Sequence, residues 1–481
     1  MSLHGIVIRC VAFLTISQTA TSQVTQQSTP SRGTLELSSS SSAAKAEFWL
    51  GVDEWQNFSY TDAQRHFDRA TSLDPTLGLA RVFTAEAAAL LGQPSRSADM
   101  EHGVADATHA STAEGLLALA WREKAAGNEQ AAAAILRAVM DLLPNEPHVV
   151  SEYVWSLTAT DAKAALEAAR AQKTKFPTFG PLSLALSYQL LQAGDTSAAL
   201  AEAERYTQLA PTQPGSFTFY GGLLQARGRY DEAEALYRRS LTLAPRHADG
   251  TNDGVIALAD LLQLRGNGAA ARQVATEALQ RATSIADSAS YLRVLGGLAL
   301  YAGDVRLAMS TFETLGRVAA SLGNGGGPAK ALMALTNAAF GDRKSVAKYI
   351  SDVRILAPGD TTQIEIWHAA VYAYAGQSDS TLKYAEKLAA RASGNPFAGR
   401  VGHFARGQLN LALRHCDKAL DEFQQSDSTW VEVQAGHAEC EKQLGHRAEA
   451  LRWRDRALAK RDLTLFDPGE IHARMRMMQM R

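Results

Sequence analysis

The chain has 481 residues, of which 46% are hydrophobic but only 7% aromatic, and its 48 basic and 50 acidic residues give a net charge of −2. A single compact core of that length would be unusually large, so several domains or a linear array are expected. The balanced charge argues against a nucleic-acid-binding protein, which usually carries a strong basic excess. Frequent Ala and only 14 Pro favour closely packed helices.

The first residues differ from the rest of the chain. A short apolar run, Cys10 to Ile16, follows Arg9 and is followed by small polar residues around Ala20. This pattern predicts a secretory signal peptide over residues 1–22, because the run is shorter than the roughly 20 apolar residues that span a bilayer. The mature protein is then periplasmic or extracellular; if the segment is not a true signal, the protein is cytoplasmic.

Residues 23–43 are rich in Ser, Thr and Gln and poor in apolar side chains, which predicts a disordered tether. No later segment has 18 consecutive apolar residues. We therefore expect no integral membrane segment in the mature chain.

A period of 34 residues runs through the middle of the sequence. Pro177, Pro211 and Pro245 lie 34 apart, and Pro144 precedes them by 33. In the block 214–247, eight residues hold repeat positions 4, 7, 8, 11, 20, 24, 27 and 32: Phe217, Tyr220, Gly221, Leu224, Ala233, Tyr237, Ser240 and Pro245. Fixed spacing of this kind is the signature of a repeat architecture.

The pattern resembles the tetratricopeptide repeat (TPR), a helix–turn–helix unit. The resemblance implies an all-α, right-handed α-solenoid of about twelve TPR-like hairpins covering residues 44–465. The best-matching units are 44–77, 113–146, 180–213 and 214–247. After Pro245 the spacing slips by four residues, and further units begin near Asn252, Ala289, Gly327, Thr362, Arg400 and Val431.

Side-chain size at the repeat positions indicates how each hairpin packs. Gly221 and Ala233 are expected to be small because two antiparallel helices touch there, while Phe217, Tyr220 and Tyr237 fill the space between hairpins. Turn glycines are expected at Gly266, Gly303, Gly341, Gly376 and Gly445, with Arg414 in the equivalent place of one exceptional unit. The unit 78–111 is expected to have a loose second helix, because its second half is polar and weakly periodic.

No motif for catalysis, a cofactor or a metal is found. The glycine-rich stretch 323–331 lacks the Gly-Lys-Ser/Thr of a phosphate-binding loop, and neither His-x-x-x-His nor Cys-x-x-Cys occurs. We therefore expect no cofactor and no metal site, and an intrinsic enzyme is the least favoured function.

Two cysteines, Cys416 and Cys440, remain after the predicted signal is removed. In an exported protein they could form a disulfide between adjacent repeats. Alternatively, both are small buried hydrophobic residues.

The TPR resemblance implies that first helices line a concave surface and that repeat positions 2, 5, 9, 12 and 13 point into it. The candidate binding residues at such positions are Phe48, Trp55, Trp121, Tyr188, Ile256, Arg293, Tyr301, Ile366, Tyr374 and Phe404. These side chains suit an apolar or aromatic peptide segment. The alternative is that they pack against neighbouring first helices.

The C-terminal residues 466–481 form a basic tail rich in Met and Arg. A polar cap on the last hairpin accounts for most of its charge, and contact with an anionic surface is the alternative. The sequence as a whole predicts a non-enzymatic scaffold of the cell envelope that binds a protein or peptide in an apolar groove. No nucleic-acid partner is expected. The second hypothesis is an accessory helical-repeat subunit of an envelope enzyme or secretion complex.

Overall fold

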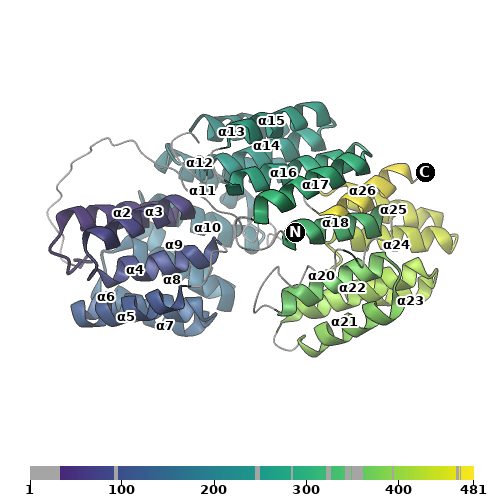
Figure 1. The fold of residues 1–481 in the computed structure, drawn as a ribbon. Coiled ribbons are helices and arrows are strands. Elements are labelled where there is room, and N and C mark those ends of the chain that lie inside the picture. Colours follow the sequence, from purple (N-terminus) through teal and green to yellow (C-terminus); the bar gives the residue numbers. More distant parts are fainter. Residues whose placement is uncertain are drawn as a thin grey trace. The chain divides into compact units, whose positions relative to one another are not determined.

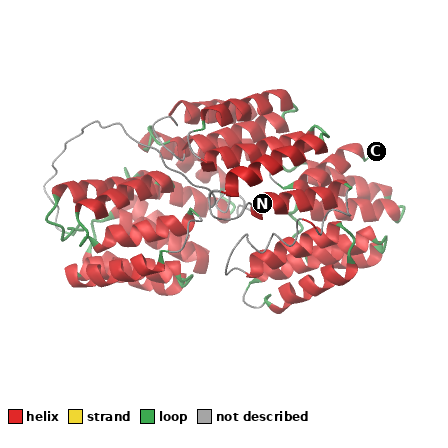
Figure 2. Ribbon diagram, in the orientation of Figure 1, coloured by secondary structure: helices red, strands yellow, loops and turns green. Residues whose placement is uncertain are grey.

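The computed structural model describes residues 33–91, 96–243, 250–282, 285–320, 327–341, 348, 361–392, 395–461, 465 and 467–480. Every regular element in those ranges is a helix, and they contain no strand (Figure 2). The predicted signal segment 1–22 and Pro245 lie outside the described residues. The chain divides into two compact units, which we describe separately.

The N-terminal unit comprises the described residues from 33 to 224 together with 229–257. Its helices follow one another as pairs (Figure 1). They are α2 (Ser42–Gln56), α3 (Tyr60–Leu73), α4 (Gly78–Leu90), α5 (Ser97–Ala110), α6 (Thr112–Ala125), α7 (Glu129–Leu142), α8 (Pro147–Thr160), α9 (Ala162–Lys175), α10 (Gly180–Gln192), α11 (Thr196–Leu209), α12 (Pro214–Ala226) and α13 (Tyr230–Leu243). Helix α14 (Gly250–Leu264) contributes residues to both units.

The C-terminal unit comprises the described residues of 258–481 and the turn 225–228. Pairs of helices continue through it, and one last helix follows them. They are α15 (Gly268–Arg281), α16 (Ile285–Tyr301), α17 (Val305–Ala319), α18 (Gly327–Phe340), α20 (Thr361–Tyr374), α21 (Ser378–Ala390), α22 (Pro396–Ala412), α23 (Cys416–Gln424), α24 (Val431–Gln443), α25 (Arg447–Leu458) and α26 (Pro468–Gln479).

The predicted all-α hairpin array is confirmed. The first helices α16, α18, α20, α22 and α24 begin within four residues of the unit starts expected from the sequence. Successive helices of each pair pack on one another, and each pair packs on the next. The chain is therefore a helical-repeat protein whose elements contact mainly their neighbours in sequence.

An aromatic ring packed on a glycine recurs in the hairpins. A methyl group added to Gly51 would lie 2.6 Å from the ring of Phe67, and one added to Gly221 would lie 2.6 Å from that of Tyr237. The same 16-residue spacing brings Phe312 onto Gly296 and Phe423 onto Gly407. The first glycine is thus small because a ring from the second helix covers it. This differs from our expectation that the two helix backbones touch at Gly221 and that Tyr237 fills the space between hairpins.

The turns inside the hairpins confirm the predicted glycines. Gly266, Gly303, Gly341, Gly376 and Gly445 all have a positive φ, and Arg414 takes the same conformation at φ 62°. In several hairpins the residue after the glycine then caps the second helix: the carboxylate of Asp304 accepts a hydrogen bond of 2.9 Å from the backbone N–H of Leu307. A positive φ favours Gly because other residues clash with their own backbone there.

Replacing Arg414 with Gly is therefore expected to stabilise the protein. The substitution relieves the left-handed conformation of an exposed side chain and raises the free energy of unfolding by about 0.5–1.5 kcal/mol. Urea denaturation measures the change. Arg414→Ala is the matched control, because it removes the same side chain but keeps the strain, so equal gains in the two variants would refute this account.

Two boundary predictions need correction. Residues 33–41, expected to belong to a disordered tether, lie along the helices, with Leu35 and Leu37 buried. The Leu35 backbone N–H donates to Glu146 at 3.1 Å, and the Ser38 N–H donates to Glu114 at 2.9 Å. The short apolar pair within a Ser-rich stretch is enough to dock this segment.

The second helix of the hairpin 78–111 is not loose. Helix α5 is regular, and it buries Met100, Val104 and Ala107 against its neighbours. Gly78 and Gly103 face each other so closely that a side chain on Gly78 would meet the backbone of Gly103. A short stripe of Met100, Val104 and Ala107, together with close packing at Gly103, is therefore enough to hold α5 in place.

The first helices of neighbouring hairpins also pack on one another, as in the pairs α4 with α6, α8 with α10, α20 with α22 and α22 with α24. Helix α2 even reaches α8, three hairpins further along the chain. We call the side of each unit formed by its first helices the inner face. This is the face on which the sequence predicts binding.

Candidate functional site

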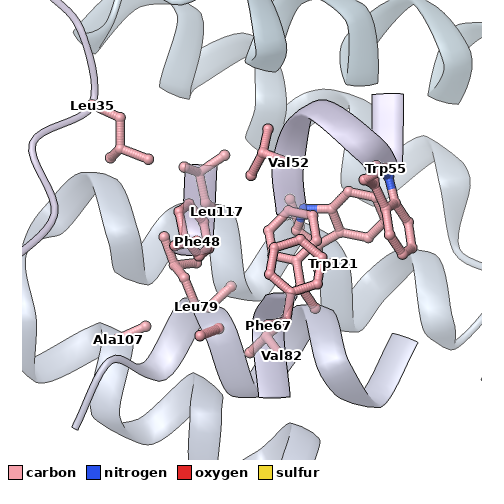
Figure 3. Packing of buried hydrophobic residues seen from close by; sticks show 14 of the residues in the cluster. Leu35, Phe48, Val52, Trp55, Phe67, Leu79, Val82, Ala107, Leu117 and Trp121 are labelled. Carbon is pink, nitrogen blue, oxygen red and sulfur yellow. The ribbon is translucent and has the colours of Figure 1, made fainter. Parts of the chain in front are cut away.

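The inner face of the N-terminal unit is filled by its own aromatic side chains. Phe48, Trp55 and Trp121 are each less than 7% exposed. The rings of Trp55 and Trp121 lie 5.0 Å apart, edge to face (Figure 3). The ring of Phe83 lies 4.8 Å from that of Trp121. These three predicted groove residues therefore form core packing between first helices in this structure, as the alternative interpretation of the sequence held.

A carboxylate ties this packing together. Glu152 on α8 accepts hydrogen bonds from the Trp55 indole at 3.2 Å and from the Gln56 amide at 2.7 Å. The Lys124 ammonium on α6 lies 2.6 Å from its other oxygen and 4.1 Å from the ring centre of Trp121. Glu152 thus joins the first, third and fourth hairpins, and its charge is matched by hydrogen-bond donors.

A second carboxyl in this unit, that of Glu86 on α4, has one buried oxygen without a hydrogen-bond partner in the described residues. Burial raises the pKa of Glu86 to about 7, and the carboxylates of Glu152 and Glu129 add to the shift although Lys124 opposes it. The folded chain then keeps a proton on Glu86 at pH values where the unfolded chain has lost it.

This shift predicts the pH dependence of stability. As the pH rises from about 4.5 to about 7, Glu86 lowers the free energy of unfolding, and the loss is complete above that range. Glu86→Gln removes the penalty, so the variant should be more stable than the parent by about 1–2 kcal/mol at pH 8 but not at pH 4.5. Urea denaturation at the two pH values measures this, with the exposed Glu167→Gln as control. A gain of equal size at both pH values would contradict the assignment.

Tyr188 and Ile256 complete the predicted candidates of this unit. Tyr188 on α10 is 6% exposed, and its ring lies 5.4 Å from that of Trp155 on α8. Ile256 on α14 is half-buried. Neither side chain offers a large exposed surface, and their role in binding stays a prediction.

The remaining candidates lie in the C-terminal unit. Phe404 is 6% exposed and contacts the ring of Tyr374 at 6.3 Å, and Ile366 packs against the helices α20–α22. Tyr301 is half-buried against α17 and α26, and burial lowers the pKa of Arg293 to about 10. Tyr301, Tyr374 and Phe404 thus lie on first helices of the C-terminal unit, whereas the candidates described above belong to the N-terminal unit.

Helix α26 covers this inner face. It contacts the first helices α16, α18 and α24, as well as α25 (Figure 1). Ile471 and Met477 are fully buried, and the His472 ring lies 5.1 Å from that of Phe340 and 6.2 Å from that of Tyr374. Residues 467–480, expected to belong to a basic tail, therefore form a docked helix.

The charges of α26 are used inside the unit. Arg474 is 1% exposed, and its guanidinium lies 2.9 Å from the carboxylate of Glu470 one turn away. Arg476 forms an ion pair with Glu439 on α24. Burial raises the pKa of Glu439 to about 7, although Arg476 opposes the shift. These two arginines are therefore engaged within the unit, and contact of this segment with an anionic surface stays an untested prediction.

Cys416 and Cys440 lie in one buried cluster, and both are free thiols. Burial raises the pKa of the Cys440 thiol, and a hydrogen bond with Cys416 adds to the shift. The structure places the two sulfur atoms as neighbours on α23 and α24 without a disulfide. Whether they become oxidised in the natural compartment stays a prediction that a free-thiol count on unfolded protein tests.

Metal sites and membrane-spanning helices were also considered in the described residues. Within the described residues, no group of three or more His, Cys, Asp or Glu side chains is arranged to hold a metal ion. The same residues contain no helix with the length and hydropathy needed to cross a membrane. We take the inner face of the C-terminal unit as the candidate site because α26 lies across its first helices.

Sequence reasoning missed α26 as part of this site. The signals that could have revealed it are the Asp467-Pro468 pair, which is typical of a helix start, and the three-residue spacing of Ile471, Arg474 and Met477. The Asp467 carboxylate does cap the helix, accepting from the Gly469 backbone N–H at 2.8 Å. The basic composition of the segment made it resemble a solvated tail, because the sequence does not show that Arg474 is buried.

Comparisons with known proteins find similarity among solved structures alone. No protein-family model matches the chain, and no curated protein matches it. Among solved structures it is similar to a tetratricopeptide repeat protein from Parabacteroides merdae, at 12% identity and TM-score 0.33, covering 57% of this chain and 93% of that one. It is also similar to yeast Tom70, at 13% identity and TM-score 0.42, covering 86% of this chain and 95% of that one.

These similarities concern the fold alone. The class itself follows from the hairpins described above, with their ring-on-glycine contacts and positive-φ turns at the predicted repeat positions. The chain is an all-α array of TPR-like helical hairpins.

Proposed function

We propose that this protein is a non-enzymatic scaffold that binds a protein or peptide partner on the inner face of its C-terminal unit. The observation that supports this proposal is α26, a helix that is not part of a hairpin and lies across the first helices of that unit. A surface that holds one helix through buried anchor side chains has the shape and chemistry to hold another. The N-terminal unit, whose inner aromatics pack on each other, then serves as structural support.

The predicted signal segment at residues 1–22 supports a location in the cell envelope. The mass of the mature chain tests this part of the proposal. A mature protein that begins after residue 22 is expected in an envelope or secreted fraction, and an intact N-terminus in the cytosol would contradict it.

Site-specific photo-crosslinking tests the binding function. A photoreactive amino acid replaces Gln443, an exposed residue beside α26 on a first helix, and separately Glu386, an exposed residue on the second helix α21. A reproducible adduct with one protein is expected from position 443 alone, and its identification shows whether the partner belongs to an enzyme or a secretion complex. Equal adducts from both positions, or none from 443, would refute an inner-face partner.

A further inference from the structure

Helix α26 docks through three side chains on one of its sides. Ile471 and Met477 are fully buried, and Arg474 between them is 1% exposed. Ile471 packs into the cluster of α16–α18, whereas Met477 packs into that of α24 and α25. The helix therefore bridges hairpins that are distant in sequence, while Met478 on its other side is 63% exposed.

This helix does not fill the face that it covers. A cavity of about 260 Å³ remains between α26 and the helices α18, α20, α22 and α24. Small side chains line much of it, among them Ala338, Ala373 and Ala435, and α26 itself presents Ala473 there. Because Ala473 is one of the small side chains that line this space, a longer side chain at its position is expected to reach into the cavity.

The polar groups around the cavity show which side chain it would suit. The hydroxyl oxygen of Tyr374 is buried without a hydrogen-bond partner in the described part of the chain. Glu432 lines the cavity too, and no described residue forms a direct ion pair with its carboxylate; burial raises the pKa of Glu432 to about 8. A buried carboxyl in that state is stabilised in its ionised form by a cation placed beside it. Arg476 of α26 also lines the cavity, but it is already paired with Glu439.

We infer that the inner face of the C-terminal unit is a docking groove for a basic amphipathic helix of a partner protein, with α26 as its internal occupant. The partner helix matches α26 at the positions of Ile471, Arg474 and Met477 but carries Lys or Arg in place of Ala473. This inference rests on the proposed function in that it assumes a protein partner, and it adds the partner's chemistry and its competition with α26.

Exchange of α26 is physically reasonable. It has 12 residues and follows the last hairpin, so its release leaves the hairpins α15–α25 with their own neighbours. A partner helix that makes one additional favourable contact, inside the cavity, binds the groove more strongly at that position than α26 does. Without α26, the cavity lining keeps the carboxylates of Glu432 and Glu439 and one cationic side chain, that of Arg414. This excess of negative charge favours a basic occupant over an acidic one.

Peptide binding to the full chain tests the inference. The released variant combines Ile471→Asp with Met477→Asp, which removes both apolar anchors of α26 in the protein. The probes are fluorescent peptides of residues 467–480, either unchanged or with Ala473→Lys. Because the groove of the parent protein is occupied, we expect the released variant to bind the unchanged peptide at least about tenfold more tightly than the parent does. The peptide with Lys should bind about fivefold to tenfold more tightly again.

Matched controls separate the parts of the inference. The protein variant Met478→Asp, which changes an exposed residue of α26, should behave as the parent. A peptide with Met478→Lys has the same net charge as the Ala473→Lys peptide but places it outside the cavity, so it should gain no such affinity. Adding Glu432→Gln to the released variant should abolish the advantage of the Ala473→Lys peptide alone.

The outcomes are decisive in both directions. A released variant that keeps its helical circular dichroism but binds neither peptide would overturn the groove, and equal affinity of the two Lys peptides would overturn the cavity assignment. If that variant does not fold, hydrogen exchange of 468–479 in the parent is measured with excess Ala473→Lys peptide. Faster exchange supports competition, and unchanged exchange overturns it. A protein adduct at position 443 combined with failure of all peptides leaves the scaffold function standing and rejects only this partner helix.

Discussion

Phe423→Ala is expected to lower the free energy of unfolding of the C-terminal unit by about 3–5 kcal/mol. Phe423 on α23 is fully buried, and its ring lies on two glycines at once. A methyl group added to Gly407 on α22 would lie 2.5 Å from the ring, and Gly436 on α24 approaches its other side. The Phe423 ring thus packs on the first helix of its own hairpin and on the first helix of the next hairpin. Both contacts are lost when the side chain is truncated.

The loss should be local as well as large. In a repeat array each hairpin is stabilised by its own packing and by its neighbours, so hydrogen exchange should accelerate in α22–α24 while α2–α13 keep their protection. Urea denaturation gives the free energy, and exchange monitored by mass spectrometry gives its location. The control is Phe397→Ala on α22, since Phe397 is 46% exposed and its truncation should cost less than about 1 kcal/mol. Similar losses in the two variants would show that the ring-on-glycine contact is not what holds these hairpins together.

The repeat register could be predicted from the sequence because it depends on local rules. Glycine at φ above zero, an aromatic residue 16 positions after a small one, and proline at a helix end each act within a single hairpin. Arg414 shows how strong the local rule is, because the chain takes the left-handed conformation there even without glycine. Helix starts in the C-terminal half were accordingly predicted within four residues despite the slip in period.

The accessibility of the inner face could not be predicted in the same way. Trp55 and Trp121 occupy positions that the repeat pattern directs inward. The sequence within one hairpin does not determine how closely its first helix approaches the first helix of another hairpin. That distance depends on contacts between hairpins 1, 3 and 4, such as those of Glu152. Covering of the C-terminal inner face likewise depends on a segment beyond the repeats, where the buried position of Arg474 contradicts the usual exposure of arginine.

Arg474→Ala is expected to be the most damaging substitution in α26. The Arg474 guanidinium is almost completely buried, donates to Glu470 at 2.9 Å and donates to the Lys460 carbonyl oxygen at 3.3 Å. Removing it takes a charged hydrogen-bond donor away from the Glu470 carboxylate, which is 5% exposed and has the Lys460 ammonium 3.9 Å away. Removing one partner of a buried ion pair costs about 3–5 kcal/mol.

Replacing both Arg474 and Glu470 distinguishes the contribution of the ion pair from the contribution of burying the two side chains. The double variant Arg474→Met with Glu470→Gln keeps the volume and removes both charges, and it should lie within about 1 kcal/mol of the parent or above it. Truncating the exposed Arg452, which is paired with the partly exposed Glu449, should cost no more than about 1 kcal/mol. Urea denaturation of Arg474→Met, of Glu470→Gln and of the double variant completes a double-mutant cycle that measures the coupling directly.

The loss of stability caused by Arg474→Ala cannot exceed the free energy with which α26 docks, so its size sets a lower limit on that docking free energy. Once the penalty exceeds the free energy that docks the helix, α26 leaves its site and the buried charges return to water. Hydrogen exchange should then show residues 468–479 unprotected while α16, α18 and α24 keep most of their protection. Collapse of protection across all these helices would instead mean that α26 is an obligatory part of the hairpin array, and exchange of α26 for a partner helix would then be energetically prohibited.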